Sequence, residues 1–107
     1  MKLALLNTSI ITADGEYSLR TISLKEAQEK VQAATEIISA IGHQSTAEIM
    51  TELLETQVPV NRILFKQEVG QEALVFKMNG RPQEGKILTR EEIEEMGFTF
   101  QLMVRKA

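Results

Sequence analysis

The residue with the clearest chemical potential is His43, which is the single histidine in the chain. Histidine is the side chain that most readily gives or takes a proton near neutral pH. His43 lies two residues before Ser45, and Ser45 and Glu48 have the spacing of a capping box, which predicts a helix start. Unpaired amides at a helix start bind anions, and the hydroxyls of Ser45 and Thr46 add donors. We therefore expect a phosphate to bind beside an imidazole that can serve as a general acid.

A structural interpretation of His43 remains open at this point, because a half-buried histidine in a turn between two helices gives the same pattern. Arg81 and Glu84 lie in the irregular segment 79–88, which contains two glycines and one proline. An arginine there can hold a phosphate through two parallel hydrogen bonds or stabilise charge that develops on it. Glu84 can orient a ribose hydroxyl or Arg81, but both residues also fit a solvated loop.

The composition excludes several kinds of site. The chain has no cysteine, which rules out a disulfide framework, a thiolate nucleophile and cysteine-ligated zinc or iron–sulfur sites. A single histidine rules out two-histidine metal sites, and no carboxylate cluster has ligand-like spacing around it, so we expect no metal and no cofactor. The formal net charge of −3 argues against general affinity for duplex DNA, which a basic face normally supplies.

Metal-free cleavage of a phosphodiester is most accessible in RNA, because the 2′-hydroxyl of the substrate can attack its own phosphate. The protein then has to orient the ribose, stabilise the charge on phosphorus and protonate the 5′-oxygen that leaves. One histidine and one arginine are sufficient for these tasks.

The elements that must position these residues belong to one domain, residues 1–107, with 43% hydrophobic and 25% charged residues. We expect no signal peptide and no membrane span, and therefore a cytoplasmic protein. The patterns predict an α+β fold, in which a mixed sheet of about five strands packs with about three helices. The predicted strands are 2–8, 17–22 beside the first, 62–66 and 72–78 as a hairpin, and 98–104.

Three capping boxes predict the helices. Ser23 and Glu26 open a helix from about Leu24 to Ile41 that Gly42 ends, although Ala34-Thr35 could divide it. Ser45 and Glu48 open a second helix that ends near Glu55, and Thr89 and Glu92 open a third that Gly97 ends.

Two helices around Gly42 also suggest a helix-turn-helix DNA-binding module. The second helix argues against this rival, because it carries Glu48, Glu52 and Glu55 and neither lysine nor arginine. Negative charge would then face the phosphates that a recognition helix approaches.

Residues 41–46 (IGHQST) and 80–89 (GRPQEGKILT) together resemble motifs of viral and mobile-element ring nucleases, which act as anti-CRISPR proteins against type III systems. Segments 7–9 (NTS) and 60–62 (VNR) are less specific echoes of the same family. The resemblance covers nearly the whole chain.

The resemblance implies a homodimer that binds cyclic tetra-adenylate across both subunits and cleaves it without metal to linear di-adenylates with 2′,3′-cyclic phosphate ends. His43 then falls on the general acid, Arg81 on the arginine that stabilises the phosphate, and Glu84 on a residue of the loop over the ligand. The ligand contacts expected in addition are Asn7, Ser9, Gly42, Ser45, Thr46, Arg62 and Lys86.

One argument from symmetry agrees with this resemblance. A ring of four nucleotides can have two-fold symmetry, as an isologous dimer does, so that each subunit offers one His43 to one phosphate. Two other interpretations stay open: a protein that sequesters a cyclic nucleotide without cleaving it, and a small dimeric partner protein with no nucleotide ligand.

Overall fold

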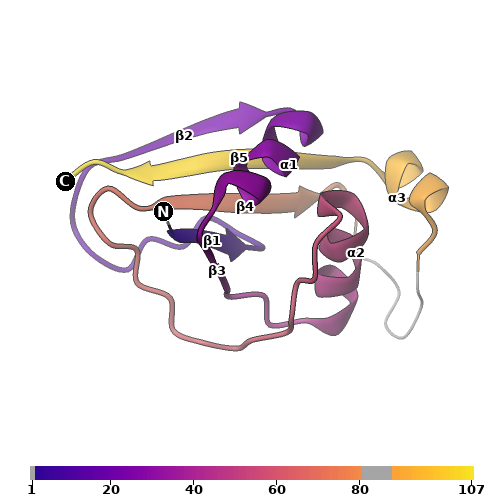
Figure 1. The fold of residues 1–107 in the computed structure, drawn as a ribbon, viewed down its shortest axis with the longest axis horizontal. Helices are drawn as coiled ribbons and strands as arrows, with labels where there is room; N and C mark the ends of the chain where they lie inside the picture. The colour runs from indigo at the N-terminus through magenta and orange to yellow at the C-terminus, as the bar shows by residue number, and fades with distance from the viewer. Residues whose placement is uncertain (1, 81–87) are drawn as a thin grey trace.

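The computed structural model describes residues 2–80 and 88–107, whose strands form a single mixed sheet (Figure 1). The strand order is β2-β5-β4-β1-β3, with β1 parallel to β3 and β4, and β5 antiparallel to β2 and β4. These residues contain five strands and three helices, which confirms the predicted α+β class. The elements are β1 (Lys2–Leu6), β2 (Tyr17–Ile22), α1 (Leu24–Ala33), β3 (Glu36–Ser39), α2 (Gln44–Leu54), β4 (Glu72–Met78), α3 (Arg90–Met96) and β5 (Phe98–Arg105).

Strand β1 is covered on both faces, as its continuous apolar run predicts. Leu3 and Leu5 pack in the larger core cluster, which contains the buried residues of all three described helices. Ala4 and Leu6 pack on the opposite face, where the cover is the irregular segment before β4, through Phe65. The helices therefore lie on one face of the sheet and coil covers part of the other.

The predicted first helix is too long, and only its first half is confirmed. Ser23 caps α1 by accepting a hydrogen bond from the Glu26 amide, but the backbone is extended at Ala34. Ile37 and Ile38 then pair with Leu3 and Ala4 as part of β3. Pairing with a buried central strand, and the β-branched isoleucines, outweigh the helical spacing that these apolar residues also satisfy. Gly42 consequently ends no helix.

Two predicted strand pairings are also wrong. Strand β2 pairs with β5 at one edge of the sheet, and does not lie beside β1. Residues 62–66 form no strand, so there is no hairpin with β4, whose neighbours are β1 and β5. Residues 62–66 do alternate between buried and exposed side chains in part, since Phe65 is buried in the core and Leu64 is fully exposed. This alternation occurs in coil and not in a strand.

The last two elements agree with the sequence. Thr89 and Glu92 form the reciprocal capping box of α3, and Gly97 ends that helix with a φ of 84°. Strand β5 follows, and its Phe100 and Leu102 are buried.

The parallel arrangement of β3, β1 and β4 places their carboxyl ends at one end of the sheet. Asn7 follows β1, residues 40–43 follow β3, and Asn79 and Gly80 follow β4. Helix α2 lies at this end, to which the arrows of β1 and β4 point in Figure 1. Ligands of parallel sheets bind at the carboxyl ends of the strands, because loops and helix N-termini converge there.

Candidate functional site

An open pocket of about 500 Å³ lies at the carboxyl ends of β1 and β3. It brings together Asn7, Gly42, His43 and Arg62, four of the residues predicted for the site. His43 is exposed, so the alternative of a half-buried structural histidine does not describe it. The other lining residues are Ala40, Ile63 and Leu64.

Helix α2 begins earlier than the predicted capping box places it. His43 is the N-cap, because its carbonyl oxygen accepts the hydrogen bond of the Ala47 amide at 3.0 Å. Ser45 and Thr46 therefore lie inside the first turn, and Ser45 caps nothing. No side chain of the described residues caps this end, and the first turn of α2 contains no acidic residue. The positive end of the α2 dipole thus lies at His43. No carboxylate in the first turn of α2 compensates this positive charge.

The backbone that leads into His43 is held by hydrogen bonds from a distant segment. The Asn61 amide donates to the carbonyl of Ile41, and its side-chain Nδ2 donates to the carbonyl of Ser39, both at 2.8 Å. Arg62 Nε donates to the carbonyl of Gly42, also at 2.8 Å. Residues 61–62 therefore satisfy the carbonyls of a turn that has no regular structure of its own.

Gly42 allows Arg62 to approach this closely. A Cβ atom at position 42 would lie 3.1 Å from Arg62 Cγ, tighter than ordinary van der Waals contact. The terminal guanidinium nitrogens of Arg62 have no hydrogen bond or ion pair with any residue that the structure describes. Arg62 therefore brings a guanidinium with free donors to the pocket that contains His43, where it can bind an anion.

The remaining predicted contacts lie elsewhere or are not described. Ser9 follows β1, and its hydroxyl is buried without a hydrogen-bond partner among the described residues. Ser9, Ser45 and Thr46 are not among the lining residues that the structure describes. Arg81, Glu84 and Lys86 lie in residues 81–87, outside the described residues, so their assignment stays a prediction.

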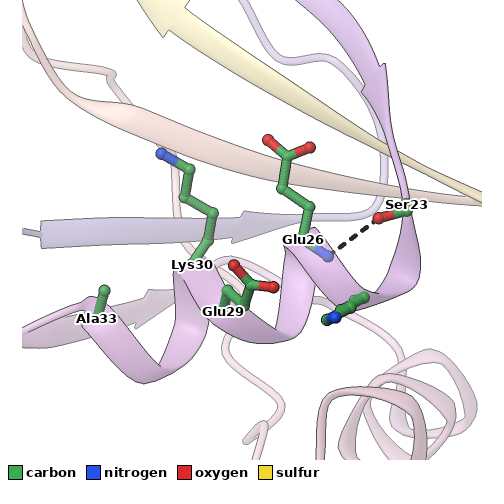
Figure 2. Close-up of a pocket in the computed structure, with 6 residues that line it drawn as sticks. Ser23, Glu26, Glu29, Lys30 and Ala33 are labelled. Atoms are coloured by element: carbon green, nitrogen blue, oxygen red, sulfur yellow. Dashed lines mark hydrogen bonds between the residues drawn. The ribbon is translucent and has the colours of Figure 1, made fainter.

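A second hollow, of about 580 Å³, runs along the exposed side of α1 (Figure 2). Its lining comes from one helix and its cap, and the charges are mixed: Lys25 and Lys30 lie among Glu26 and Glu29. A hollow with alternating charge offers no concentrated site for an anion, and we assign it no ligand.

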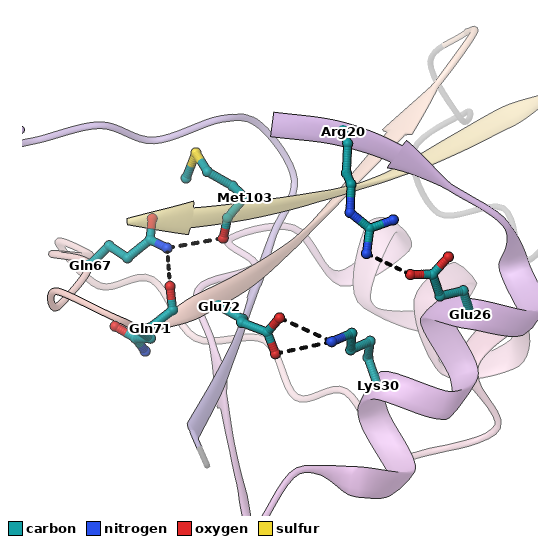
Figure 3. A network of polar contacts seen from close by, with 7 residues as sticks. All are labelled: Arg20, Glu26, Lys30, Gln67, Gln71, Glu72 and Met103. Carbon is teal, nitrogen blue, oxygen red and sulfur yellow. Dashed lines mark hydrogen bonds and ion pairs between the residues drawn. The ribbon is translucent and has the colours of Figure 1, made fainter. Parts of the chain in front are cut away.

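The charged residues near α1 instead attach this helix to the sheet (Figure 3). Lys30 Nζ contacts Glu72 of β4 at 3.0 Å, and Arg20 of β2 contacts Glu26 at 2.8 Å. The hydrogen bond to the Glu26 carboxylate raises the pKa of Arg20 above its ordinary value. In the same view, buried Gln67 donates to the carbonyls of Gln71 and Met103, which fixes the segment before β4 against β5.

Several residues of the site have no clear signal in the sequence. Asn61 belongs to the segment 60–62, but only Arg62 of that segment was expected to contact a ligand. Ser39 has no neighbouring motif, and the sequence pattern predicts a strand that includes Ile63 and Leu64. In the residues that the structure describes, no group of three or more His, Asp or Glu side chains is arranged to hold a metal ion.

The fold is that of a small α+β protein, with a pocket containing His43 and Arg62 at the carboxyl ends of its parallel strands. The chain belongs to the STIV B116-like family, whose model matches residues 3–100. The solved structure of B116 of Sulfolobus turreted icosahedral virus superposes with a TM-score of 0.83 and 25% sequence identity. The match covers 97% of this chain and 98% of that one.

The relatives come from a bacterium and from viruses. The uncharacterized protein YddF of Bacillus subtilis is 31% identical over 106 residues, which is 98% of each chain. The uncharacterized protein ORF117 of Acidianus two-tailed virus is 37% identical over 101 residues, 90% of this chain and 86% of the relative. Across the described part of this chain, no helix has the length and apolar character needed to cross a membrane.

Proposed function

We propose that this protein is a metal-independent ring nuclease, which binds cyclic tetra-adenylate across a homodimer and cleaves it to linear di-adenylates with 2′,3′-cyclic phosphate ends. The observation that carries the proposal is the exposed His43 at the start of α2, which no described side chain caps, in the same pocket as Arg62. A helix N-terminus and a guanidinium attract a phosphate, and an imidazole beside that phosphate can protonate a leaving oxygen.

The proposed reaction uses the substrate's own nucleophile. The 2′-hydroxyl oxygen attacks phosphorus as its proton passes to solvent, and the bond from phosphorus to the 5′-oxygen breaks. The His43 imidazolium gives its proton to that 5′-oxygen. Arg62 at the pocket and Arg81 from segment 81–87 balance the negative charge on the phosphate, while Glu84 orients the attacking hydroxyl. The product keeps a 2′,3′-cyclic phosphate, and each imidazole regains its proton from water.

The apolar rim of the pocket supports a dimer. The pocket is open, so the described residues of one subunit do not enclose a ligand there. A second subunit with the same pocket would supply the rest of the site. Ile63 and Leu64 line the pocket and are 44% and 101% exposed, and Val60 beside them is 40% exposed. Apolar side chains at the rim of a ligand pocket are suited to contact between two copies.

The biological consequence of this activity is the loss of a defence signal. Cyclic tetra-adenylate is the second messenger of type III CRISPR systems, so its cleavage switches that signalling off. We propose that the protein acts in the cytoplasm, which is the cytoplasm of the host cell when a virus or mobile element encodes it.

The deciding experiment incubates the protein with cyclic tetra-adenylate in excess EDTA and separates the products. We expect linear di-adenylates with 2′,3′-cyclic phosphate ends. Tight binding without products would identify a protein that sequesters the messenger, and absence of both binding and products would indicate a partner protein without a nucleotide ligand. Either of these outcomes contradicts the proposed nuclease.

A further inference from the structure

The turn between β3 and α2 has little structure of its own, although it carries His43. Residues 40–43 lie in neither a helix nor a strand, and the N-cap of α2 has no capping side chain among the described residues. Backbone carbonyls that lack a regular partner must find another donor or water. What holds this turn therefore determines where the imidazole lies.

Asn61 makes one hydrogen bond to the turn, through its backbone amide, and one to the end of β3 directly before the turn, through its side chain. Its backbone amide donates to the carbonyl of Ile41, and its side-chain Nδ2 donates to the carbonyl of Ser39. These two carbonyls belong to the residues on either side of Ala40, so Asn61 is hydrogen-bonded to the backbone both before and after Ala40. Arg62 adds a third bond, from Nε to the carbonyl of Gly42.

Ser39 joins the same two segments in the opposite direction. Its hydroxyl donates to the carbonyl of Pro59 at 2.6 Å and accepts the amide of Ile41 at 3.3 Å. Ser39 is only 5% exposed, so water has little access to compete for these bonds. Segment 59–62 thus donates hydrogen bonds to segment 39–42 and also accepts one from it. These bonds fix the two segments relative to each other.

We infer that Asn61 is a positioning residue for His43: it holds the turn from β3 to α2 in the conformation that presents the imidazole to the pocket. This inference rests on the proposed function for its kinetic consequence, but not for its structural one. Asn61 does not line the pocket. It acts through the backbone of residues 39–42, and the same segment carries Arg62 into the pocket.

The first test is kinetic and compares Asn61→Ala and Asn61→Asp with the wild type. The aspartate keeps the size of the side chain but cannot donate to the Ser39 carbonyl, and its charge opposes that oxygen. Because Asn61 is exposed, neither change opens a cavity in the core. We expect kcat on cyclic tetra-adenylate to fall by about tenfold or more in both variants, with KM within about threefold of wild type, because misplaced catalytic groups slow the chemical step.

The matched control is Gln57→Ala. Gln57 is also exposed and polar, lies in the same connection between α2 and β4, and lies outside the pocket lining. We expect wild-type kcat and KM for this variant. A wild-type kcat in Asn61→Ala would overturn the inference if the wild-type protein cleaves the ring.

The second test does not depend on activity. His43 is the single histidine of the chain, so its ring resonances in an NMR spectrum report one residue without assignment ambiguity. We expect shifted or broadened His43 ring signals in Asn61→Ala and Asn61→Asp, with the amide signals of β4 and β5 unchanged, and no change in Gln57→Ala.

The two tests separate the inference from the proposed function. Unchanged His43 ring signals in both Asn61 variants would overturn the positioning role, whatever the activity. If the wild type does not cleave cyclic tetra-adenylate but the ring signals respond to Asn61, the proposed function fails and the positioning role stands.

Discussion

Arg62 donates a hydrogen bond from Nε to the carbonyl oxygen of Gly42, the residue before His43, at 2.8 Å. This bond joins the coil before β4 to the turn after β3, and it brings a guanidinium into the pocket that His43 lines. The Nε atom bonds the Gly42 carbonyl, while the terminal nitrogens bond none of the residues that the structure describes. The position of the guanidinium is thereby tied to the position of the proposed general acid.

Replacement of His43 tests the acid directly. We expect His43→Ala to lower the rate of ring cleavage by about 100-fold or more, because a positioned acid contributes about that much to proton transfer. The affinity for the intact ring should stay within a few-fold of wild type, since the proton is needed only in the transition state. Single-turnover kinetics and equilibrium binding measure the two effects separately.

The control for this variant is Gln44→Ala. Gln44 is the exposed neighbour of His43, and its side chain bonds only Glu48, at 2.9 Å, within the described residues. Its replacement should leave the cleavage rate near wild type. A His43→Ala protein as fast as this control would remove His43 from the mechanism.

A charged residue in place of Leu64, at the exposed apolar rim of the pocket that contains His43, should prevent dimer formation. Leu64 lies at the pocket and is fully exposed, so Leu64→Glu should leave the folding of one subunit intact and yield a monomer in sedimentation experiments. Val69→Glu is the matched control, because Val69 is 61% exposed but lies at the turn before β4 and does not line the pocket. Equal oligomeric states for the two variants would contradict a contact at Leu64.

Gly97 and Gly70 differ in what an added Cβ atom would meet. Both have a φ of +84°, but a Cβ at Gly97 would lie 2.5 Å from Asn79 Nδ2, whereas nothing lies within 4 Å at Gly70. We expect Gly70→Ala to lower the free energy of unfolding by about 1 kcal/mol. Gly97→Ala should lower it by about 2–4 kcal/mol, because the φ of 84° and ψ of 145° at Gly97 strongly favour glycine and the Asn79 side chain must also move.

Chemical denaturation of the two alanine variants measures this difference. The Asn79 amide also donates to the Gly97 carbonyl at 3.1 Å. A shift of Asn79 away from an added Cβ atom would therefore strain this hydrogen bond. Equal losses of stability in the two variants would contradict the expected order.

The two ion pairs of α1 should differ in strength. The Lys30 and Glu72 side chains are 28% and 15% exposed, whereas those of Arg20 and Glu26 are 57% and 37% exposed. Water screens the second pair more, so a double-mutant cycle should give about 1 kcal/mol of coupling for Lys30–Glu72 and a smaller coupling for Arg20–Glu26. A larger coupling for the exposed pair would contradict this order.

Local sequence signals were sufficient where a single segment decides the structure. The capping box of Thr89 and Glu92 and the terminal Gly97 define α3 without help from other segments. The apolar run of β1 likewise predicts a strand buried on both faces, which Leu3 and Ala4 confirm. These features depend on neighbours along the chain, so the sequence is enough to find them.

Where two structures satisfy the same pattern, only packing decides between them. Residues 34–41 have the apolar spacing of a helix, but Ile37 and Ile38 pair beside β1, and a strand results. Leu64 and Phe65 have the alternation of a strand, but no strand of the described residues pairs with segment 62–66, which instead bonds to the turn before His43 through Arg62. Periodicity describes which residues are buried, and it does not identify the segment that buries them.

The candidate site also combines features that the sequence predicts with features that depend on contacts between distant segments. The sequence alone determined that His43 is the sole histidine, that its neighbours begin a helix, and that cysteine chemistry is excluded. Only the tertiary structure decided that Asn61 and Arg62 hold the turn that carries it, because these contacts join residues about 20 positions apart through backbone carbonyls. Every residue has the same backbone carbonyl, so no sequence motif can show from which distant side chain that carbonyl will accept a hydrogen bond.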